Sequence, residues 1–242
     1  MTLEDIAARF GLTPSAVAGL RAILELQAED PTAPTAVRAP EESAERHVAD
    51  SLVALEIPAV RAARRVADLG SGAGWPGLAL AAALPDAQVA LVESASRHCR
   101  YLAKAVAAAQ LTNAEVVHAR VEEWPTGLGA HDLVTARAVA ALPVLCEYAA
   151  PLLVDDGVLV AWKAQVADDE AAAGAAAAAE VGLAAEEVRA VQPYPTAEQR
   201  TLHVFRKIAP TPARFPRRPG MAAKRPLGAS RGANPPPPRL AS

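Results

Sequence analysis

Residues 67–77 read A-D-L-G-S-G-A-G-W-P-G and directly follow Arg65-Val66. This order predicts the end of a buried strand, a tight glycine turn and the start of a helix. Glycine has no Cβ, so Gly70, Gly72 and Gly74 allow positive φ and let backbone N–H groups approach a ligand closely. The turn therefore indicates a site for a nucleotide-like cofactor.

Two classes of cofactor fit this turn. Residues 72–77 match the G-x-G-x-x-G spacing of dinucleotide sites, and Glu93 ends the next predicted strand, where a ribose-binding acid belongs. S-adenosylmethionine is favoured because Asp68 can meet a positively charged amino-acid group, directly or through water. Pro76 also removes a backbone N–H that a pyrophosphate would use. We therefore expect S-adenosylmethionine with Glu93 on its ribose, and NAD(P)-dependent oxidation is the alternative.

Composition limits the possible classes of protein. With 242 residues and 52% apolar content, the chain can bury one sizeable core. Cys99 and Cys146 show no metal-ligand spacing with the five histidines, so we expect neither disulfides nor a metal site. No signal-peptide pattern and no run of roughly 18 apolar residues is present. We expect a cytoplasmic protein without membrane association.

Charge is distributed unevenly along the chain. The net charge is −3, yet residues 207–242 carry eight Lys or Arg and no acid. A basic tail on an acidic body indicates contact with a polyanion, although a solvated tail without a partner is the alternative. Nine of the 21 prolines lie in the same segment. We expect extended or disordered structure there, and no contribution to the core.

Periodicity divides the chain into three parts: a helical extension over 1–60, an α/β domain over 61–208 and a basic proline-rich tail over 209–242, partly disordered. In the extension, helices are expected over 2–10, 13–30 and 41–55. The domain's expected strands are 66–69, 88–93, 114–118, 131–135, 157–163, 186–192 and 201–207. Its expected helices are 76–83, 96–109, 141–153 and 168–181. This alternation predicts a doubly wound, mostly parallel sheet. The last two strands lack a helix between them, so one should run antiparallel.

Several stretches occur together in one known family. They are E-R-H-V-A-D-S-L at 45–52, D-L-G-S-G-A-G-W-P-G-L-A-L at 68–80, A-R-V-E-E at 119–123, T-A-R-A-V-A-x-L at 135–142, W-K-A at 162–164, Q-R-T-L-H-V-F-R-K at 199–207, T-P-x-x-F-P-R-R-P-G at 211–220 and K-R-P-L at 224–227. In this ordered set the chain resembles the bacterial 16S rRNA guanine-N7 methyltransferases, also called glucose-inhibited division protein B. It departs from the family at residues 33–35, which read Ala-Pro-Thr in place of Asn-Leu-Thr, and at Thr201, where a histidine is common.

The resemblance implies a Rossmann-like class I S-adenosylmethionine-dependent methyltransferase with a seven-stranded, mostly parallel sheet. It implies transfer of a methyl group to N7 of a guanosine in the 530 loop of 16S rRNA, at position 527 in rRNA numbering. The partner would be 16S rRNA, the small ribosomal subunit or its assembly intermediate, and we expect a monomer without metal. A non-catalytic ribosome-associated binding protein with this fold is a further alternative.

The resemblance also assigns roles to residues. Gly70, Gly72, Gly74 and Trp75 would form the cofactor loop, with the indole packed on the cofactor. Val121 and Glu122 would hold the adenine. Arg137 would border the methyl donor, while Arg120, Lys163 and Arg200 would face the RNA or the target base. A surface ion pair is the alternative for each basic residue. His47 and Asp50, neighbours on one predicted helix, would shape the pocket rim or serve in packing.

Overall fold

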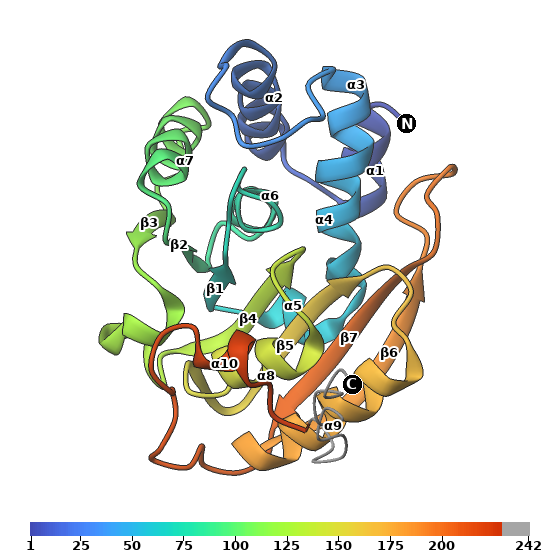
Figure 1. Ribbon diagram of the computed structural model, residues 1–242. Coiled ribbons are helices and arrows are strands. Elements are labelled where there is room, and N and C mark those ends of the chain that lie inside the picture. The colour runs from blue at the N-terminus through green and yellow to red at the C-terminus, as the bar shows by residue number, and fades with distance from the viewer. Residues whose placement is uncertain (229–242) are drawn as a thin grey trace, which may run out of the picture.

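The computed structural model describes residues 1–228 and shows one seven-stranded sheet between layers of helices (Figure 1). The strands are β1 (Arg65–Leu69), β2 (Gln88–Glu93), β3 (Ala114–His118), β4 (His131–Arg137), β5 (Leu153–Lys163), β6 (Leu183–Val191) and β7 (Arg200–Lys207). Their order in the sheet is β3-β2-β1-β4-β5-β7-β6. The first five are parallel, and β7 runs antiparallel to both β5 and β6. The predicted doubly wound α/β fold and its antiparallel strand are confirmed.

Ten α-helices connect or flank the strands of the described chain. They are α1 (Leu3–Phe10), α2 (Pro14–Glu29), α3 (Pro40–Ser43), α4 (Asp50–Leu52), α5 (Pro58–Ala62), α6 (Gly77–Ala83), α7 (Ser96–Ala108), α8 (Leu142–Ala149), α9 (Asp168–Val181) and α10 (Met221–Lys224). A π-helical turn, η1 (Ala44–Ala49), joins α3 to α4, and a 3₁₀ turn, η2 (Val53–Glu56), continues the segment. Two further 3₁₀ turns, η3 (Val121–Glu123) and η4 (Pro125–Gly127), follow β3.

Local sequence signals explain most helix boundaries. Thr2 and Asp5 form a reciprocal capping box, and Thr13 caps α2, whose first residue is Pro14. Gly182 ends α9 in the left-handed conformation, with φ of 87°. The helix predicted over 141–153 is shorter than expected, because β5 already begins at Leu153 to pair with β4. Pairing across the sheet overrides local helix propensity there.

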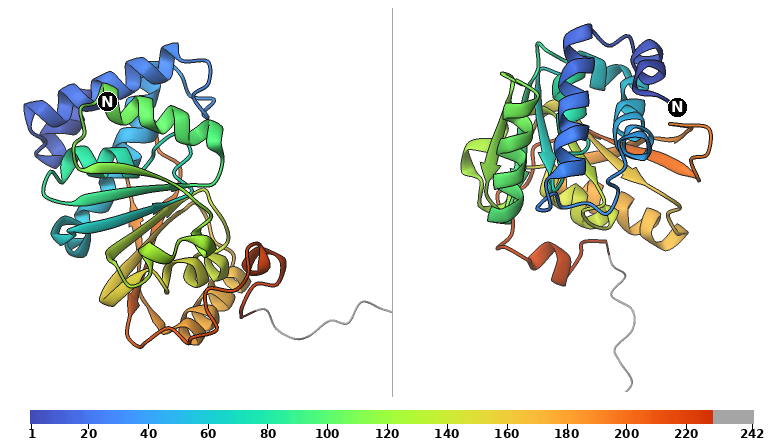
Figure 2. Two further views of the ribbon diagram at one scale, coloured as in Figure 1. Left: turned by 90° about the vertical axis from the view of Figure 1, so that its left-hand side faces the viewer. Right: turned by 90° about the horizontal axis from the view of Figure 1, so that it is seen from above.

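The two faces of the sheet carry separate core clusters. Alternate residues of a strand point to opposite faces, so Val66 and Leu133 join one cluster while Ala67 and Val134 join the other. Figure 2 shows the N-terminal helices together with α6 and α7 on one side, and α8 and α9 on the other. The fold is therefore a three-layer arrangement.

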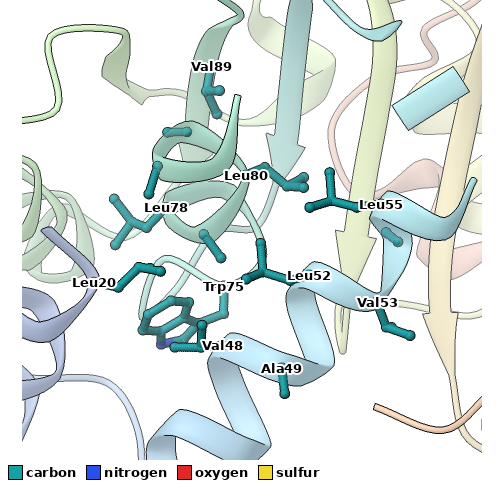
Figure 3. Packing of buried hydrophobic residues seen from close by; sticks show 14 of the residues in the cluster. Leu20, Val48, Ala49, Leu52, Val53, Leu55, Trp75, Leu78, Leu80 and Val89 are labelled. Atoms are coloured by element: carbon teal, nitrogen blue, oxygen red, sulfur yellow. The ribbon is translucent and has the colours of Figure 1, made fainter. Parts of the chain in front are cut away.

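The N-terminal extension shares its core with the sheet domain. One buried cluster contains Leu20 of α2, Leu52 of α4, Leu78 of α6 and Trp75 of the glycine turn (Figure 3). Each of these side chains is at most 4% exposed. The extension thus covers α6 and fixes the glycine turn from outside.

The C-terminal tail joins the second core cluster as far as residue 228. Phe215 and Leu227 are buried in it, and an ion pair links Arg217 to Glu147 of α8. The expectation that this tail contributes nothing to the core is therefore wrong for these residues, because two apolar side chains join the cluster that α8 and α9 form with the sheet. The prediction of disorder for residues 229–242 lies outside the described residues.

Candidate active site

The predicted site residues lie along one edge of the sheet. Parallel strands bring their carboxyl ends to the same edge, so the ends of β1, β2, β3, β4 and β5 meet there, and antiparallel β7 contributes its first residue, Arg200. The chain winds from β1 through β2 to β3 in one direction and from β4 to β5 in the other. Ligands of open α/β sheets bind at this kind of reversal.

The glycine turn after β1 has the predicted conformation. Gly70, Gly72 and Gly74 have φ of 62°, 52° and 99°. A Cβ at Gly74 would lie 2.1 Å from the Leu78 side chain, and one at Gly70 would lie 3.0 Å from Val139. The turn therefore requires glycine for its backbone conformation and for close packing.

Asp68 lies beneath this turn, fully buried at the end of β1. Its Oδ1 accepts a hydrogen bond from the Thr135 hydroxyl at 2.9 Å, whereas Oδ2 has no partner within residues 1–228. Burial raises the pKa of Asp68 to about 6, although hydrogen bonds and the charge of Arg137 oppose the rise. A buried carboxylate oxygen without a partner is costly, so this atom is suited to a ligand or a water molecule.

Glu93 ends β2 and is attached to the turn. Its Oε2 accepts a hydrogen bond from the Gly72 N–H at 3.1 Å, and its Oε1 accepts one from the Ala95 N–H at 2.7 Å. His98 Nδ1 lies 3.5 Å from Oε2. Glu93 is therefore held beside the glycine turn rather than pointing freely into solvent.

Trp75 corrects one expectation. Its indole is 4% exposed, donates a hydrogen bond from Nε1 to Gln27 Oε1 at 3.0 Å, and stacks on the His47 ring with centroids 5.6 Å apart. Figure 3 shows it between Leu20 and Val48. The indole packs against the N-terminal extension instead of facing a cofactor, because α2 and η1 offer it an apolar cover and a buried acceptor.

Val121 and Glu122 lie in η3, the turn after β3, and both are half-buried. Glu122 Oε1 accepts a hydrogen bond from the Gly220 N–H at 2.8 Å. The acid expected to hold the adenine is thus attached to the C-terminal tail. No signal in the local sequence connects two residues so far apart.

Three of the four predicted basic residues line one cavity of about 410 Å³, at the ends of β4, β5 and β7. They are Arg137, Lys163 and Arg200, and Arg46, His47 and Asp50 line the same cavity. The fourth basic residue, Arg120, is exposed after β3, and it makes no ion pair with any residue from 1 to 228. The structure therefore assembles a basic cavity beside the glycine turn and leaves Arg120 outside it.

Asp50 connects two of these arginines. Arg137 Nη1 donates to Asp50 Oδ2 at 2.8 Å, and Arg200 Nε donates to Oδ1 at 3.3 Å. The backbone carbonyl of Asp50 accepts the Trp162 indole N–H at 2.7 Å. Sequence reasoning gave Asp50 no definite role; the signal that could have found it is an acid three residues after His47 on the same predicted helix, within the E-R-H-V-A-D-S-L segment.

Lys163 has a different partner. Its Nζ lies 2.6 Å from Glu170 Oε1 and 3.1 Å from the Ala140 carbonyl. Glu170 also accepts the Leu142 N–H at 3.0 Å, and the pKa of this carboxyl is lowered by these hydrogen bonds against the opposing effect of burial. Lys163 is therefore held at the rim of the cavity by the start of α9.

Within residues 1–228, no group of three or more His, Cys, Asp or Glu side chains is arranged to hold a metal ion. None of the helices in this range combines the length and apolar character that a membrane span requires.

Comparison with solved structures identifies the class of the fold. The chain aligns with an antibiotic-resistance methyltransferase, Kmr, at a TM-score of 0.52 and 20% identity, covering 61% of this chain and 88% of that one. It aligns with a predicted O-methyltransferase from Agrobacterium tumefaciens at 0.53 and 25%, covering 66% and 81%. With the glycine turn and buried acid at the end of β1, these likenesses define a Rossmann-like class I methyltransferase fold.

Sequence relatives identify the family. Residues 28–201 match the GidB family, described as rRNA small subunit methyltransferase G. A protein of that name from Rubrobacter xylanophilus is 41% identical over 196 residues, 78% of this chain and 75% of its own. Another from Chloroflexus aggregans is 41% identical over 198 residues, 80% and 82%. The chain belongs to the rRNA small subunit methyltransferase G family, and is thus a member of a family of rRNA methyltransferases.

Proposed function

We propose that this protein transfers a methyl group from S-adenosylmethionine to N7 of a guanosine in the 530 loop of 16S rRNA. One observation carries the proposal beyond the family. A glycine turn over a buried, half-satisfied carboxylate lies at the same sheet edge as a cavity lined by Arg137, Lys163 and Arg200. The glycine turn and its carboxylate form the first half of the site, which suits a cationic small molecule. The basic cavity forms the second half, which suits an anionic polymer.

The residues of the first half fit S-adenosylmethionine. Asp68 Oδ2 has no partner among residues 1–228 and lies beneath the turn, where a water-mediated contact to an ammonium group would satisfy it. Glu93 lies beside the Gly72 N–H with further lone pairs on both carboxylate oxygens, as a ribose diol requires. A solved methyltransferase-fold protein, P. horikoshii TYW2, is in complex with MeSAdo and aligns at a TM-score of 0.50. When bound, S-adenosylmethionine supplies an electrophilic methyl group.

The second half needs no proton-transfer residue for this reaction. Guanine N7 carries an in-plane lone pair that is unprotonated at neutral pH, so no general base is needed. The chain then contributes alignment and a field suited to the charge that develops on the base. Arg137 can hold guanine O6 through its planar fork while leaving N7 free, and Lys163 and Arg200 can bind phosphates.

Exposed basic groups outside the cavity extend this surface. Arg120 follows β3 at the same edge, and the adjoining C-terminal tail presents Arg218, Lys224 and Arg225. Contacts of this kind supply salt-dependent affinity for an RNA backbone. We infer that the enzyme acts as a cytoplasmic monomer on 16S rRNA, the small subunit or its assembly intermediate, with the target base exposed in a loop because the A-form major groove is deep and narrow.

Mapping of 16S rRNA methylation by mass spectrometry tests the proposal. Cells that lack the protein should lose N7-methylguanosine from the 530 loop, and the intact chain should restore it. The doubly substituted form Asp68→Ala, Gly72→Val should not restore it, because both the carboxylate and the turn are lost. Restoration by this form would instead indicate a non-catalytic ribosome-associated protein.

A second measurement separates cofactor classes. Equilibrium dialysis of the purified protein should show binding of labelled S-adenosylmethionine and none of NADH. Binding of NADH alone would overturn the assignment of the first half of the site and favour the oxidoreductase alternative.

A further inference from the structure

His47 contacts Arg137 from the N-terminal extension. Its Nδ1 lies 3.3 Å from Arg137 Nη2, and its Nε2 lies 3.1 Å from the Thr35 hydroxyl. Arginine carries only N–H donors, so Nδ1 must accept this hydrogen bond. The imidazole is therefore the Nε2–H tautomer, with Nε2 donating to Thr35 Oγ1.

The ring is also fixed by stacking. It lies nearly parallel to the Trp75 indole, at an interplanar angle of 12°, and Trp75 follows directly on the last glycine of the cofactor turn. The indole in turn donates to Gln27, which is fully buried and donates to the Val37 carbonyl and the Ser43 hydroxyl. A continuous chain of contacts thus joins the glycine turn to the guanidinium of Arg137.

The environment keeps His47 neutral. Burial, followed by the positive charge of Arg137, lowers the pKa of His47 to about 3. Because the neutral ring carries a lone pair at Nδ1, it can accept the hydrogen bond from Arg137 and hold the guanidinium in one orientation. Asp50 holds Nη1 of the same group from another direction, so Nη1 and Nη2 each have a partner in the extension.

We propose that His47 is a positioning residue, which orients Arg137 through Nδ1 and joins that arginine to the cofactor turn through its stack on Trp75. The proposal rests on the proposed function only in taking Arg137 as a residue that touches the RNA. Because the stack and the acceptor are separate features of one side chain, two substitutions can distinguish them.

His47→Phe keeps a ring on Trp75 and removes the acceptor. His47→Asn removes the ring and keeps an acceptor oxygen near the position of Nδ1. We expect His47→Phe to lower kcat of methyl transfer to 16S rRNA about 10–100-fold, the range found when groups that orient a reactive residue are removed. Its Kd for S-adenosylmethionine and its thermal midpoint should stay near those of the wild type. His47→Asn should recover a large part of kcat.

His131→Phe is the matched control. His131 is also buried and packs on a tryptophan, Trp124, with centroids 5.0 Å apart, but it lies at the opposite edge of the sheet at the start of β4. The turnover of His131→Phe should equal that of the wild type. Equal turnover in His47→Phe as well would overturn the proposal, and so would a kcat of His47→Asn as low as that of His47→Phe.

Nitrogen-15 NMR of the wild-type imidazoles tests the same geometry without any variant or any activity. The spectrum should show His47 as the neutral Nε2–H tautomer at pH 7. A protonated ring or an Nδ1–H tautomer would overturn the proposal even if the enzyme methylates rRNA. Conversely, the expected tautomer in a protein without methyltransferase activity would support the positioning contact and refute the proposed function.

Discussion

The two halves of the proposed active site, a cofactor half around the glycine turn and a basic half around the cavity, are built differently. The cofactor half comes from one continuous stretch, residues 67–77, and one acid at the end of the neighbouring strand, Glu93. The basic half takes its side chains from η1, α4, β4, β5 and β7, which are far apart in sequence (Figure 1). The first half is negatively charged and largely buried, whereas four Lys or Arg side chains and one acid, Asp50, line the second.

This difference shows which parts of a site are recognisable in one sequence. A glycine turn must be local, because consecutive residues have to adopt positive φ within a few positions. A cavity for a polyanion can draw each cation from a separate element, because the sheet brings distant strand ends to one edge. Substitutions in the cofactor half should therefore change the Kd for S-adenosylmethionine, whereas substitutions in the basic half should change kcat/KM for RNA methylation.

The largest expected effect is that of Arg137→Ala in the basic half. Loss of the guanidinium should lower kcat/KM for RNA methylation at least about 10²–10³-fold, as removal of a single electrostatic donor does at other active sites. The Kd for S-adenosylmethionine, measured by calorimetry, should change little. Arg137→Lys serves as a control that keeps the charge and loses the fork. Near-normal turnover of Arg137→Ala would contradict the division between the halves.

The next effect concerns Asp68→Asn in the cofactor half. Removal of this charge should weaken binding of S-adenosylmethionine by about 10-fold or more, since a charge-assisted contact contributes roughly 1.5–3 kcal/mol. RNA binding should persist in a filter-binding assay. If affinity for RNA fell and affinity for the cofactor did not, the assignment of the two halves would be reversed.

The same substitution should stabilise the fold at neutral pH. Burial raises the pKa of Asp68 from 3.8 to about 6. The folded state therefore binds more protons than the unfolded state between these values, and the free energy of unfolding falls as pH rises from about 4 to 6. The loss is at most about 3 kcal/mol. Urea denaturation of Asp68→Asn should lack this fall, and an unchanged pH profile would contradict burial of the carboxylate.

His47, in the basic half, should have a smaller effect on the pH dependence of the free energy of unfolding, and in the opposite direction. Its pKa is lowered from 6.5 to about 3, so below pH 6.5 the unfolded state binds the extra proton and stability falls as the pH decreases. At pH 5 the loss is about 1–2 kcal/mol. The free energy of unfolding of His47→Phe, measured at pH 7 and pH 5, should fall less than that of the wild type. Equal falls would indicate that the ring is already charged when folded.

The smallest effect is expected from removal of residues 229–242. The turnover of the shortened chain should stay within about twofold of the intact protein, with a modest loss of salt-dependent RNA affinity because two arginines are removed. Methylation assays at two salt concentrations would measure both. A large loss of turnover would place part of the site beyond residue 228.

Most of the fold could be predicted because its signals are local and periodic. The alternation of strands and helices from Arg65 onward and the missing helix before β7 gave the sheet and its antiparallel strand. The tail was predicted less well, since proline and charge dominate its composition while a few side chains, among them Phe215 and Leu227, anchor it in the core. Average composition does not reveal a few well-placed apolar anchors.

The glycine turn, the acid before it and the class of cofactor that they favour could all be inferred from consecutive residues, because these features depend on backbone geometry over a few positions. Three other features required the folded chain: Trp75 faces the N-terminal extension, Asp50 joins Arg137 to Arg200, and Arg120 lies apart from them. Side-chain partners of this kind follow from packing between distant segments. A buried contact or an ion pair contributes its free energy only when folding has removed both partners from water and placed them next to each other.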